Sequence, residues 1–427
     1  MGTLASPPID RFNLSLCGSF LLGLVVLVPW NFLVMADDYW KYKFRSDNAT
    51  DGGNSGEINE NQKFFISYLS SVCNGIYLVV LFLNTISTVR VSSVSRISGS
   101  LIGTTLAMIL TTVFVEVNTD SWKDEFLVLS LVIAGLTSFL VAILSGSSTG
   151  ICGFLPQRFM AACLLGQSVG GVLCASVQIG CLAFGFSSQK TALLFFSIAI
   201  CILLITSIVW PLMRSTDFFR HYQRIASCSD DVSVSDVSCM PYGGSRLTVF
   251  WRVFLQGWQF HITALIAGTF SMPIFPNLGY AGQSVNVDIS PFLKTFFLPL
   301  ACSLTYSLAD VSGRYFENLR PYNPSRRKLL LALSFSRVLL IPLLLVCNLN
   351  PLKRNVTEVL IRSDEVFALI MLVAGFSNGF LLNAAFKNSP GATSLEYQEI
   401  SATITVCFYG TGATLGSLLS ILLLKLL

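Results

Sequence analysis

An acid and a base stand four residues apart inside an apolar segment of the sequence. They are Asp310 and Arg314, in the stretch SLADVSGRYF. A charged side chain in the hydrocarbon of a bilayer is costly, so it persists only where a partner, water or a ligand compensates. The spacing i, i+4 puts both groups on one helix face, where they can neutralise each other. A carboxylate acceptor beside a guanidinium donor predicts a hydrophilic binding site for a polar solute within a membrane domain.

Three further polar side chains lie deep in apolar segments. Trp30 and Asn31 follow Pro29 in the first segment. We expect Trp30 to stack on a flat solute rather than only pack, because Asn31 beside it needs a polar partner. Gln167 offers both donors and an acceptor, which suits the edge of a heterocycle. Further candidates for the pocket or a gate are Asn74, Tyr77, Arg337 and Asn378.

Two of the remaining ionisable groups have open interpretations. Arg337 needs a buried partner, for which we consider Glu116 and a backbone carbonyl, and it could be a gate or a structural lock. His261 could relay protons near neutral pH. A hydrogen-bonded packing role is the favoured interpretation of His261. Trp40 closes the first segment and suits the membrane interface, where tryptophan is enriched.

The composition identifies the class of protein that must position these groups. The chain has 427 residues, of which 53% are hydrophobic and 12% are charged, whereas soluble domains are about 25% charged. This favours an all-α polytopic membrane protein. Eleven apolar windows reach spanning length. They are residues 13–35, 64–88, 98–116, 126–147, 159–185, 191–213, 250–272, 291–313, 329–347, 364–385 and 400–425.

The polar stretches predict an orientation. Basic residues concentrate in 214–249 and 314–328. Because cytosolic loops are enriched in Lys and Arg, we expect a cytosolic N-terminus and an extracellular or luminal C-terminus. The sequons at Asn48 and Asn355 then lie outside and are predicted glycosylation sites. We expect a six-helix half at 1–213, a flexible cytosolic linker at 214–249 and a five-helix half at 250–427, with the site between the halves.

Several function classes lack support in the sequence. The chain contains two histidines and no Walker loop or GxSxG motif, so we expect neither an enzyme nor a metal site. Its twelve cysteines lie mostly in apolar segments without CxxC spacing. The net charge of +4 gives little support for nucleic-acid binding. We expect a carrier in the lipid bilayer that binds a solute without a cofactor.

Five motifs occur in a specific order along the chain. They are PWN at Trp30, GQSVGG at Gln167, Asp310-Val-Ser-Gly-Arg314, SRVLLIPLLLVCN at Arg337 and FSNGF at Asn378. Each is weak alone. In this order, and on these predicted spans, they resemble the equilibrative nucleoside transporter family over nearly the whole chain.

The resemblance implies a fold, a function and roles for four residues. The fold would be related to the major facilitator superfamily, with six helices in one half and five in the other. The function would be sodium-independent facilitated diffusion of purine and pyrimidine nucleosides by alternating access. Trp30 would pack against the nucleoside and Gln167 would hydrogen-bond the base. Asp310 and Arg314 would hold the ribose hydroxyls.

The resemblance also frames the alternatives. One alternative is a carrier of the same fold for nucleobases or another polar solute, with or without proton coupling. A membrane protein without transport activity is the other. We expect a monomer. The N-terminus lacks the acidic dileucine signal of a lysosomal relative, which favours the plasma membrane over the endolysosomal membrane.

Overall fold

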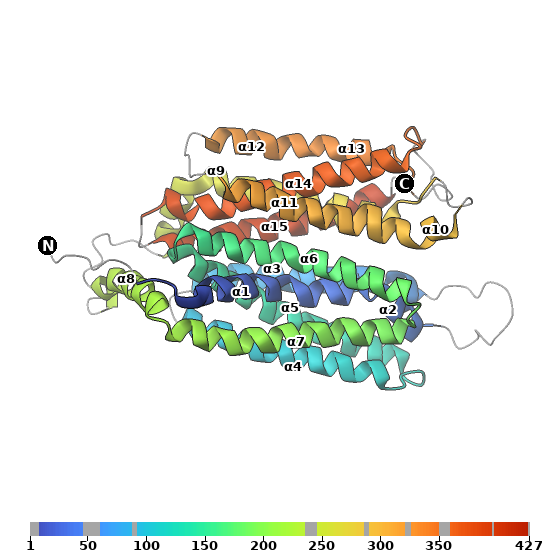
Figure 1. Cartoon of the computed structure of the whole chain (residues 1–427), viewed down its shortest axis with the longest axis horizontal. Helices are drawn as coiled ribbons and strands as arrows, with labels where there is room; N and C mark the ends of the chain where they lie inside the picture. Colours follow the sequence, from blue (N-terminus) through green and yellow to red (C-terminus); the bar gives the residue numbers. More distant parts are fainter. Residues whose placement is uncertain are drawn as a thin grey trace.

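The protein is described here from a computed structural model. It describes residues 8–45, 60–87, 92–234, 246–285, 290–320, 326–349, 359–394 and 397–425. These ranges are predominantly helical, and the long helices run side by side along the long axis of the molecule (Figure 1). The only β pairing within them consists of two isolated bridges. The all-helical class predicted from the composition is therefore confirmed.

The first part of the chain forms α1 (Leu14–Met35), α2 (Asp37–Lys43), α3 (Glu60–Ser87), α4 (Ser93–Glu116), α5 (Lys123–Phe154), α6 (Gln157–Ala183), α7 (Ser188–Ser215) and α8 (Asp217–Val234). The second part forms α9 (Arg246–Met272), α10 (Pro291–Phe297), α11 (Thr305–Asn318), α12 (Arg327–Ser336), α13 (Leu340–Leu345), α14 (Asp364–Asn388) and α15 (Gln398–Lys425). Short 3₁₀ and π-helical turns join several of them, including Leu298–Leu304 between α10 and α11.

Nine of the helical segments in the described ranges are long and apolar enough to cross a membrane. The predicted count of eleven is thus not confirmed. Window 64–88 is helical as α3, within which Tyr68–Leu83 forms an apolar stretch. Window 291–313 is divided among α10, a π-helical turn and α11. That segment also continues to Asn318, past the predicted end, which brings further polar residues into the helix.

The predicted flexible linker was partly wrong. Residues 217–234 form α8, which begins two residues after α7 ends. Phe218 and Phe219 are buried, the first against Phe159 and the second edge-on to Trp210. These two aromatic side chains anchor α8 on the bundle. The prediction of a flexible linker rested on the serines and acids that follow them in the sequence. Residues 235–245 of the linker lie outside the described residues.

Glycines bring three pairs of helices into backbone contact. The pairs are α1 with α6, α9 with α15, and α11 with α14. A methyl group on one helix would overlap a carbonyl oxygen of the other at Gly166 and Phe20, at Gly412 and Leu265, and at Gly379 and Asp310. Small residues permit this approach in membrane helices. Gly379 thereby fixes the backbone at Asp310.

Three buried apolar clusters hold the bundle together. One lies within residues 22–219 and another within 274–374. The third, which we call the joint core, contains residues from both the first and the second part of the chain. Its buried members are Val80, Leu81, Ala142, Cys152, Met160, Cys163, Leu164, Phe260, Ala264, Ala267, Leu330, Leu381, Leu382, Ala384, Ala385, Phe386, Ala402 and Val406. Many of these residues lie near the end of α5, the start of α6, the end of α14 or the start of α15. The joint core therefore packs the two parts of the chain together at one end of the bundle.

Candidate functional site

The pair predicted from the sequence is present on α11. Arg314 Nε donates to Asp310 Oδ2 at 3.0 Å. Asp310 is 6% exposed and Arg314 is 4% exposed. The i, i+4 spacing places them on one face of the helix, as predicted. Burial removes both charges from water, so each depends on the other and on further hydrogen bonds.

Groups from two other helices complete the pair. Asp310 Oδ1 accepts from Asn378 Nδ2 of α14 at 2.7 Å. Asp310 Oδ2 also accepts from the hydroxyl of Ser168 on α6. Arg314 Nη1 donates to the carbonyl oxygen of Leu164, also on α6, at 2.9 Å. Both carboxylate oxygens are thus engaged by protein, and the contacts to α6 bridge the two parts of the chain.

A second buried arginine is connected to Asp310 through a serine. Ser271 Oγ lies 2.6 Å from Asn378 Oδ1 and accepts from Arg337 Nη2 at 2.7 Å. Arg337 is 2% exposed, and its Nη1 donates to the carbonyl oxygen of Ala374 at 2.9 Å and to the Ser377 hydroxyl. Arg337 therefore orients the amide that binds Asp310. We call the connected set the Asp310 network: Leu164, Ser168, Ser271, Asp310, Arg314, Arg337 and Asn378.

Of the two partners considered for Arg337, the structure contains one. The expected backbone carbonyl is confirmed as that of Ala374. The alternative, Glu116, is wrong, because this residue is exposed at the end of α4. A fully buried guanidinium bonded to one carbonyl and two hydroxyls has the character of a structural lock.

Arg337→Lys tests this role, because a single ammonium cannot reproduce a planar fork with separate donors to Ala374 and Ser271. We expect the variant to keep the fold but to bind solute about tenfold more weakly, since the amide of Asn378 loses its fixed orientation. Concentration-dependent uptake by cells expressing each form separates KM from the maximal rate. A variant with unchanged KM and reduced surface level would assign Arg337 to folding alone.

Three predicted site residues lie outside the network. Gln167 precedes Ser168 on α6 and is half-buried. Trp30 and Asn31 are half-buried on α1, and Trp30 packs against the apolar cluster within residues 22–219. Within the described ranges, none of these three side chains forms a hydrogen bond. Their polar groups are therefore free to meet a solute, and their roles remain predictions.

Asn74 and Tyr77 make separate contacts between helices. Asn74 Nδ2 lies 3.5 Å from the Ser417 hydroxyl on α15, and Tyr77 donates to the Ser145 hydroxyl on α5 at 3.0 Å. These contacts tie α3 to its neighbours and do not reach Asp310. The predicted glycosylation sites Asn48 and Asn355 lie outside the described residues.

Four buried polar residues were not evident as site residues from the sequence. Ser168 and Ser271 gave no signal, because serine is common in membrane helices, where it bonds its own helix backbone. Ser271 Oγ does so too, 2.6 Å from the carbonyl oxygen of Ala267. Glu317 and Lys387 form a second buried pair, with Lys387 Nζ 3.5 Å from Glu317 Oε1. That pair was not evident because the predicted span ended at residue 313, before Glu317.

His261 has the surroundings of a packing residue. It is fully buried, and its ring packs against the rings of Phe254 and Phe408, which also contact each other. Its Nδ1 is 3.0 Å from the Thr405 hydroxyl, and Nε2 has no partner among the described residues. No acid in the described part of the chain is a partner of the ring, so the geometry favours packing over proton relay.

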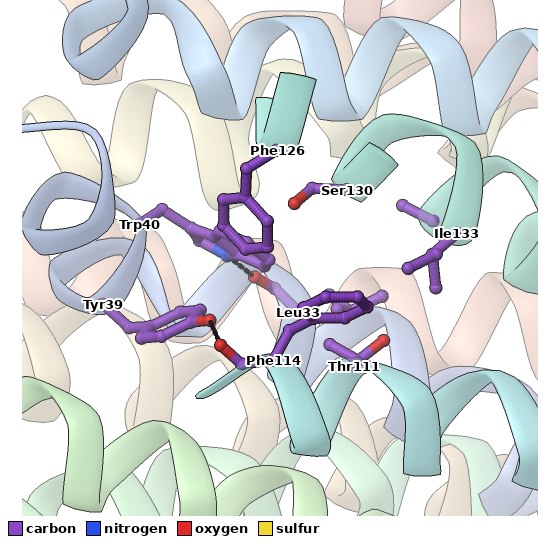
Figure 2. Close-up of a pocket in the computed structure, with 9 residues that line it drawn as sticks. Leu33, Tyr39, Trp40, Thr111, Phe114, Phe126, Ser130 and Ile133 are labelled. Atoms are coloured by element: carbon purple, nitrogen blue, oxygen red, sulfur yellow. Dashed lines mark hydrogen bonds between the residues drawn. The ribbon is translucent and has the colours of Figure 1, made fainter. Parts of the chain in front are cut away.

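A small cavity lies apart from the Asp310 network, among α1, α2, α4 and α5 (Figure 2). It measures about 10 Å³, close to the space needed for one water molecule. Trp40 donates from Nε1 to the Leu33 carbonyl oxygen at 2.9 Å and is 3% exposed. The Trp40 ring is enclosed by Phe44 and Phe65, and its position at the membrane interface stays a prediction.

Comparison with known proteins identifies similar sequences over nearly the full length. The family model described as "Nucleoside transporter" matches residues 129–425. "Equilibrative nucleoside transporter 3" of Rattus norvegicus is 29% identical over 97% of this chain and 90% of its own length. "Equilibrative nucleoside transporter 1" of Homo sapiens is 24% identical over 98% and 99%.

Solved structures show the same fold at low sequence identity. The human organic anion transporter MFSD10 superposes with a TM-score of 0.59 at 16% identity, covering 98% of this chain and 95% of its own. The major facilitator superfamily transporter FucP, in the outward conformation, gives a TM-score of 0.54 at 12% identity over 97% of each chain. The chain thus has an overall fold similar to that of these two transporters, as expected.

Proposed function

The chain belongs to the nucleoside transporter family, and from that premise we propose that it carries purine and pyrimidine nucleosides by sodium-independent facilitated diffusion. The observation that carries this proposal is the Asp310 network. It places a buried carboxylate and guanidinium between α6 of the first part of the chain and α11 and α14 of the second. A vicinal diol offers donors and acceptors that match this pair.

The proposed architecture has two halves around that site. Helices α1, α3, α4, α5, α6 and α7 would form the six-helix half, within residues 1–213. Residues 214–249 would link it to the five-span half, formed by α9, α10 with α11, α12 with α13, α14 and α15. The bias in basic residues supports a cytosolic N-terminus and an extracellular C-terminus in the plasma membrane.

In the proposed site, Asp310 and Arg314 hold the ribose hydroxyls, Gln167 bonds the base and Trp30 packs against it. The Ser168 hydroxyl bonds the same carboxylate oxygen that a ribose hydroxyl would need. Replacement of Ser168 by the ribose would therefore break one contact between the halves when solute binds. Binding would thus loosen the two halves relative to each other, as alternating access requires.

Gln167→Ala is expected to change base preference. Its amide can both donate to and accept from a base edge, whereas alanine can do neither. We expect the ratio of uridine to adenosine affinity to shift by about tenfold, the value of one or two hydrogen bonds. The measurement is inhibition of labelled uridine uptake by unlabelled adenosine and uridine. Identical ratios in both proteins would remove Gln167 from the base-binding site.

A closed end of the bundle supports alternating access. Glu399 of α15 accepts from the Ser93 hydroxyl of α4 at 2.7 Å, and Arg96 Nη2 lies 3.8 Å from Glu399 Oε1. These contacts and the joint core lie at the end that we assign to the cytosol. The structure would therefore be closed toward the cytosol, and cytosolic release would require these contacts to separate.

Glu399→Gln is expected to open this end more often, because the glutamine loses its charge attraction to Arg96. A partly exposed pair contributes at most about 1 kcal/mol, so we expect up to about fivefold faster opening. The readout is labelling of Cys152 and Cys163, both fully buried in the joint core, by a permeant thiol reagent. Cys302 in a different cluster is the internal control. Equal labelling of the joint-core cysteines in both proteins would contradict the gate.

A competition assay tests the proposed substrate class. Cells expressing the chain should take up labelled uridine saturably, and unlabelled nucleosides should compete. Nucleosides modified at the ribose hydroxyls should compete poorly, because Asp310 and Arg314 would lose their partners. Strong competition by free nucleobases, with indifference to the ribose, would instead identify a nucleobase carrier.

A further inference from the structure

A second cavity lies at the end of the bundle next to α11, α12 and α14. It measures about 100 Å³. Its walls are formed by Glu317, Arg320, Arg326, Leu329, Leu330, Leu333, Phe380 and Asn388. None of these residues belongs to the Asp310 network, so the cavity is a separate feature of the five-span half.

Two buried polar atoms of its lining residues lack a hydrogen-bond partner in the described part of the chain. They are Nη1 of Arg326, a charged donor, and Oδ1 of Asn388, an acceptor. Asn388 is 5% exposed and uses its Nδ2 to bond the Ala384 carbonyl oxygen at 2.7 Å. A buried polar group without a partner is costly, so such groups indicate a missing water or ligand.

The charge around the cavity favours an anion. Arg320 and Arg326 line it against the single carboxylate of Glu317. That carboxylate is already paired with Lys387, which also donates to the Glu317 carbonyl oxygen at 2.7 Å. The Arg320 guanidinium lies 5.1 Å from the centre of the Phe380 ring, which holds it beside the cavity. The unpaired charge at the cavity is therefore positive.

One wall of the cavity belongs to the surface that faces lipid. Leu329 and Leu333, one turn apart on α12, are 57% and 41% exposed. The cavity thus lies where an apolar helix face meets a polar helix end. In the orientation proposed with the function, this is the cytosolic leaflet. Basic pockets between membrane helices on that side suit lipid head groups.

We propose that this cavity binds the phosphodiester head group of an anionic phospholipid. Arg320 and Arg326 bind the phosphate, and Asn388 Oδ1 accepts from a head-group ammonium or hydroxyl. Leu329 and Leu333 support an acyl chain. On the scale by which about 10–15 Å³ holds one water molecule, a volume of about 100 Å³ has room for several, which is enough for a phosphate group. The inference depends on the proposed function only for the orientation.

Lipid binding to the purified full chain tests the proposal. Native mass spectrometry in detergent would compare phosphatidylserine, whose head group carries a donor, with phosphatidylcholine, which has none. We expect one tightly bound phosphatidylserine, held about tenfold more tightly than phosphatidylcholine, since charge-assisted bonds are strong. Arg326→Gln should lower its affinity by about tenfold, and the exposed Arg320→Gln should also lower it.

Lys328→Gln is the matched control, because Lys328 is an exposed cation on the same helix that does not line the cavity. We expect its affinity for phosphatidylserine to be unchanged. Equal losses for Arg326→Gln and Lys328→Gln would overturn the site in favour of a general basic surface. Inorganic phosphate that raises the unfolding temperature as much as the lipid would identify a soluble anion and overturn the lipid assignment.

Uridine uptake into liposomes by the same variants separates this proposal from the transport function. Absence of lipid selectivity in the unmodified chain, with normal uptake, overturns the lipid site alone. Normal lipid selectivity without uptake by the unmodified chain overturns the proposed function and leaves the lipid site standing.

Discussion

Asp310→Asn is expected to reduce nucleoside uptake more than about 100-fold, because breaking a buried ion pair costs about 3–5 kcal/mol. The carboxylate accepts from Ser168, Arg314 and Asn378 at the same time. Asparagine offers one oxygen, and its amide would point donors at other donors. Arg314 would keep the Leu164 carbonyl but lose its counter-charge. A nucleoside would then face the uncompensated guanidinium of Arg314, and its ribose hydroxyls would lose their carboxylate acceptor.

The measurement is initial uptake of labelled uridine, divided by the amount of protein at the cell surface. Asp120→Asn is the matched control, since Asp120 is exposed and pairs with Arg45 at 2.9 Å on the surface. Exposed ion pairs contribute little to stability, so uptake by Asp120→Asn should be nearly unchanged. If Asp310→Asn retained normal uptake per molecule at the surface, the ribose-binding assignment would be wrong.

Gly379→Ala should abolish uptake as well, through the backbone of Asp310. A methyl group at residue 379 would overlap the Asp310 carbonyl oxygen and lie 2.8 Å from its carbonyl carbon. Both atoms belong to the main chain, so α11 and α14 must move apart. Overpacking typically costs about 1–3 kcal/mol, and here it also displaces the acid that binds solute.

Gly180→Ala provides the comparison, because a methyl group there meets nothing within 4 Å. Alanine stabilises a helix by up to about 1 kcal/mol relative to glycine, so this variant should transport normally. Surface level and uridine uptake are measured for both variants. Normal uptake by Gly379→Ala would mean that α11 and α14 separate easily, and that Asp310 does not depend on their contact.

The centre of the site could be predicted because charge in an apolar helix is unmistakable. Asp310, Arg314 and Arg337 stood out for this reason, and Asn378 stood out beside its serine and glycine neighbours. Ser168 and Ser271 could not be found in the same way, since a serine that bonds another helix resembles one that bonds its own. Only the packing of α6 and α14 against α11, and of α9 against α14, distinguishes them.

The fold was predictable in class and in most spans, but less so at helix ends. The apolar windows located the long helices, because spanning length leaves a strong signal. The segment after residue 313 was misjudged, because Glu317 is compensated by Lys387, seventy residues further along the chain. The burial of Trp40 was not evident from the sequence for a similar reason, since its aromatic neighbour Phe65 comes from α3. Such long-range compensation is not visible in local composition.

The most direct test of the central claim is uridine transport by the purified chain in liposomes. The account predicts that internal uridine rises until it equals the external concentration, and then stops. A sodium gradient or an inward proton gradient should not change this plateau, and Asp310→Asn should not reach it in the same time. Accumulation above the external concentration when the outside is acidic would contradict facilitated diffusion and indicate proton coupling.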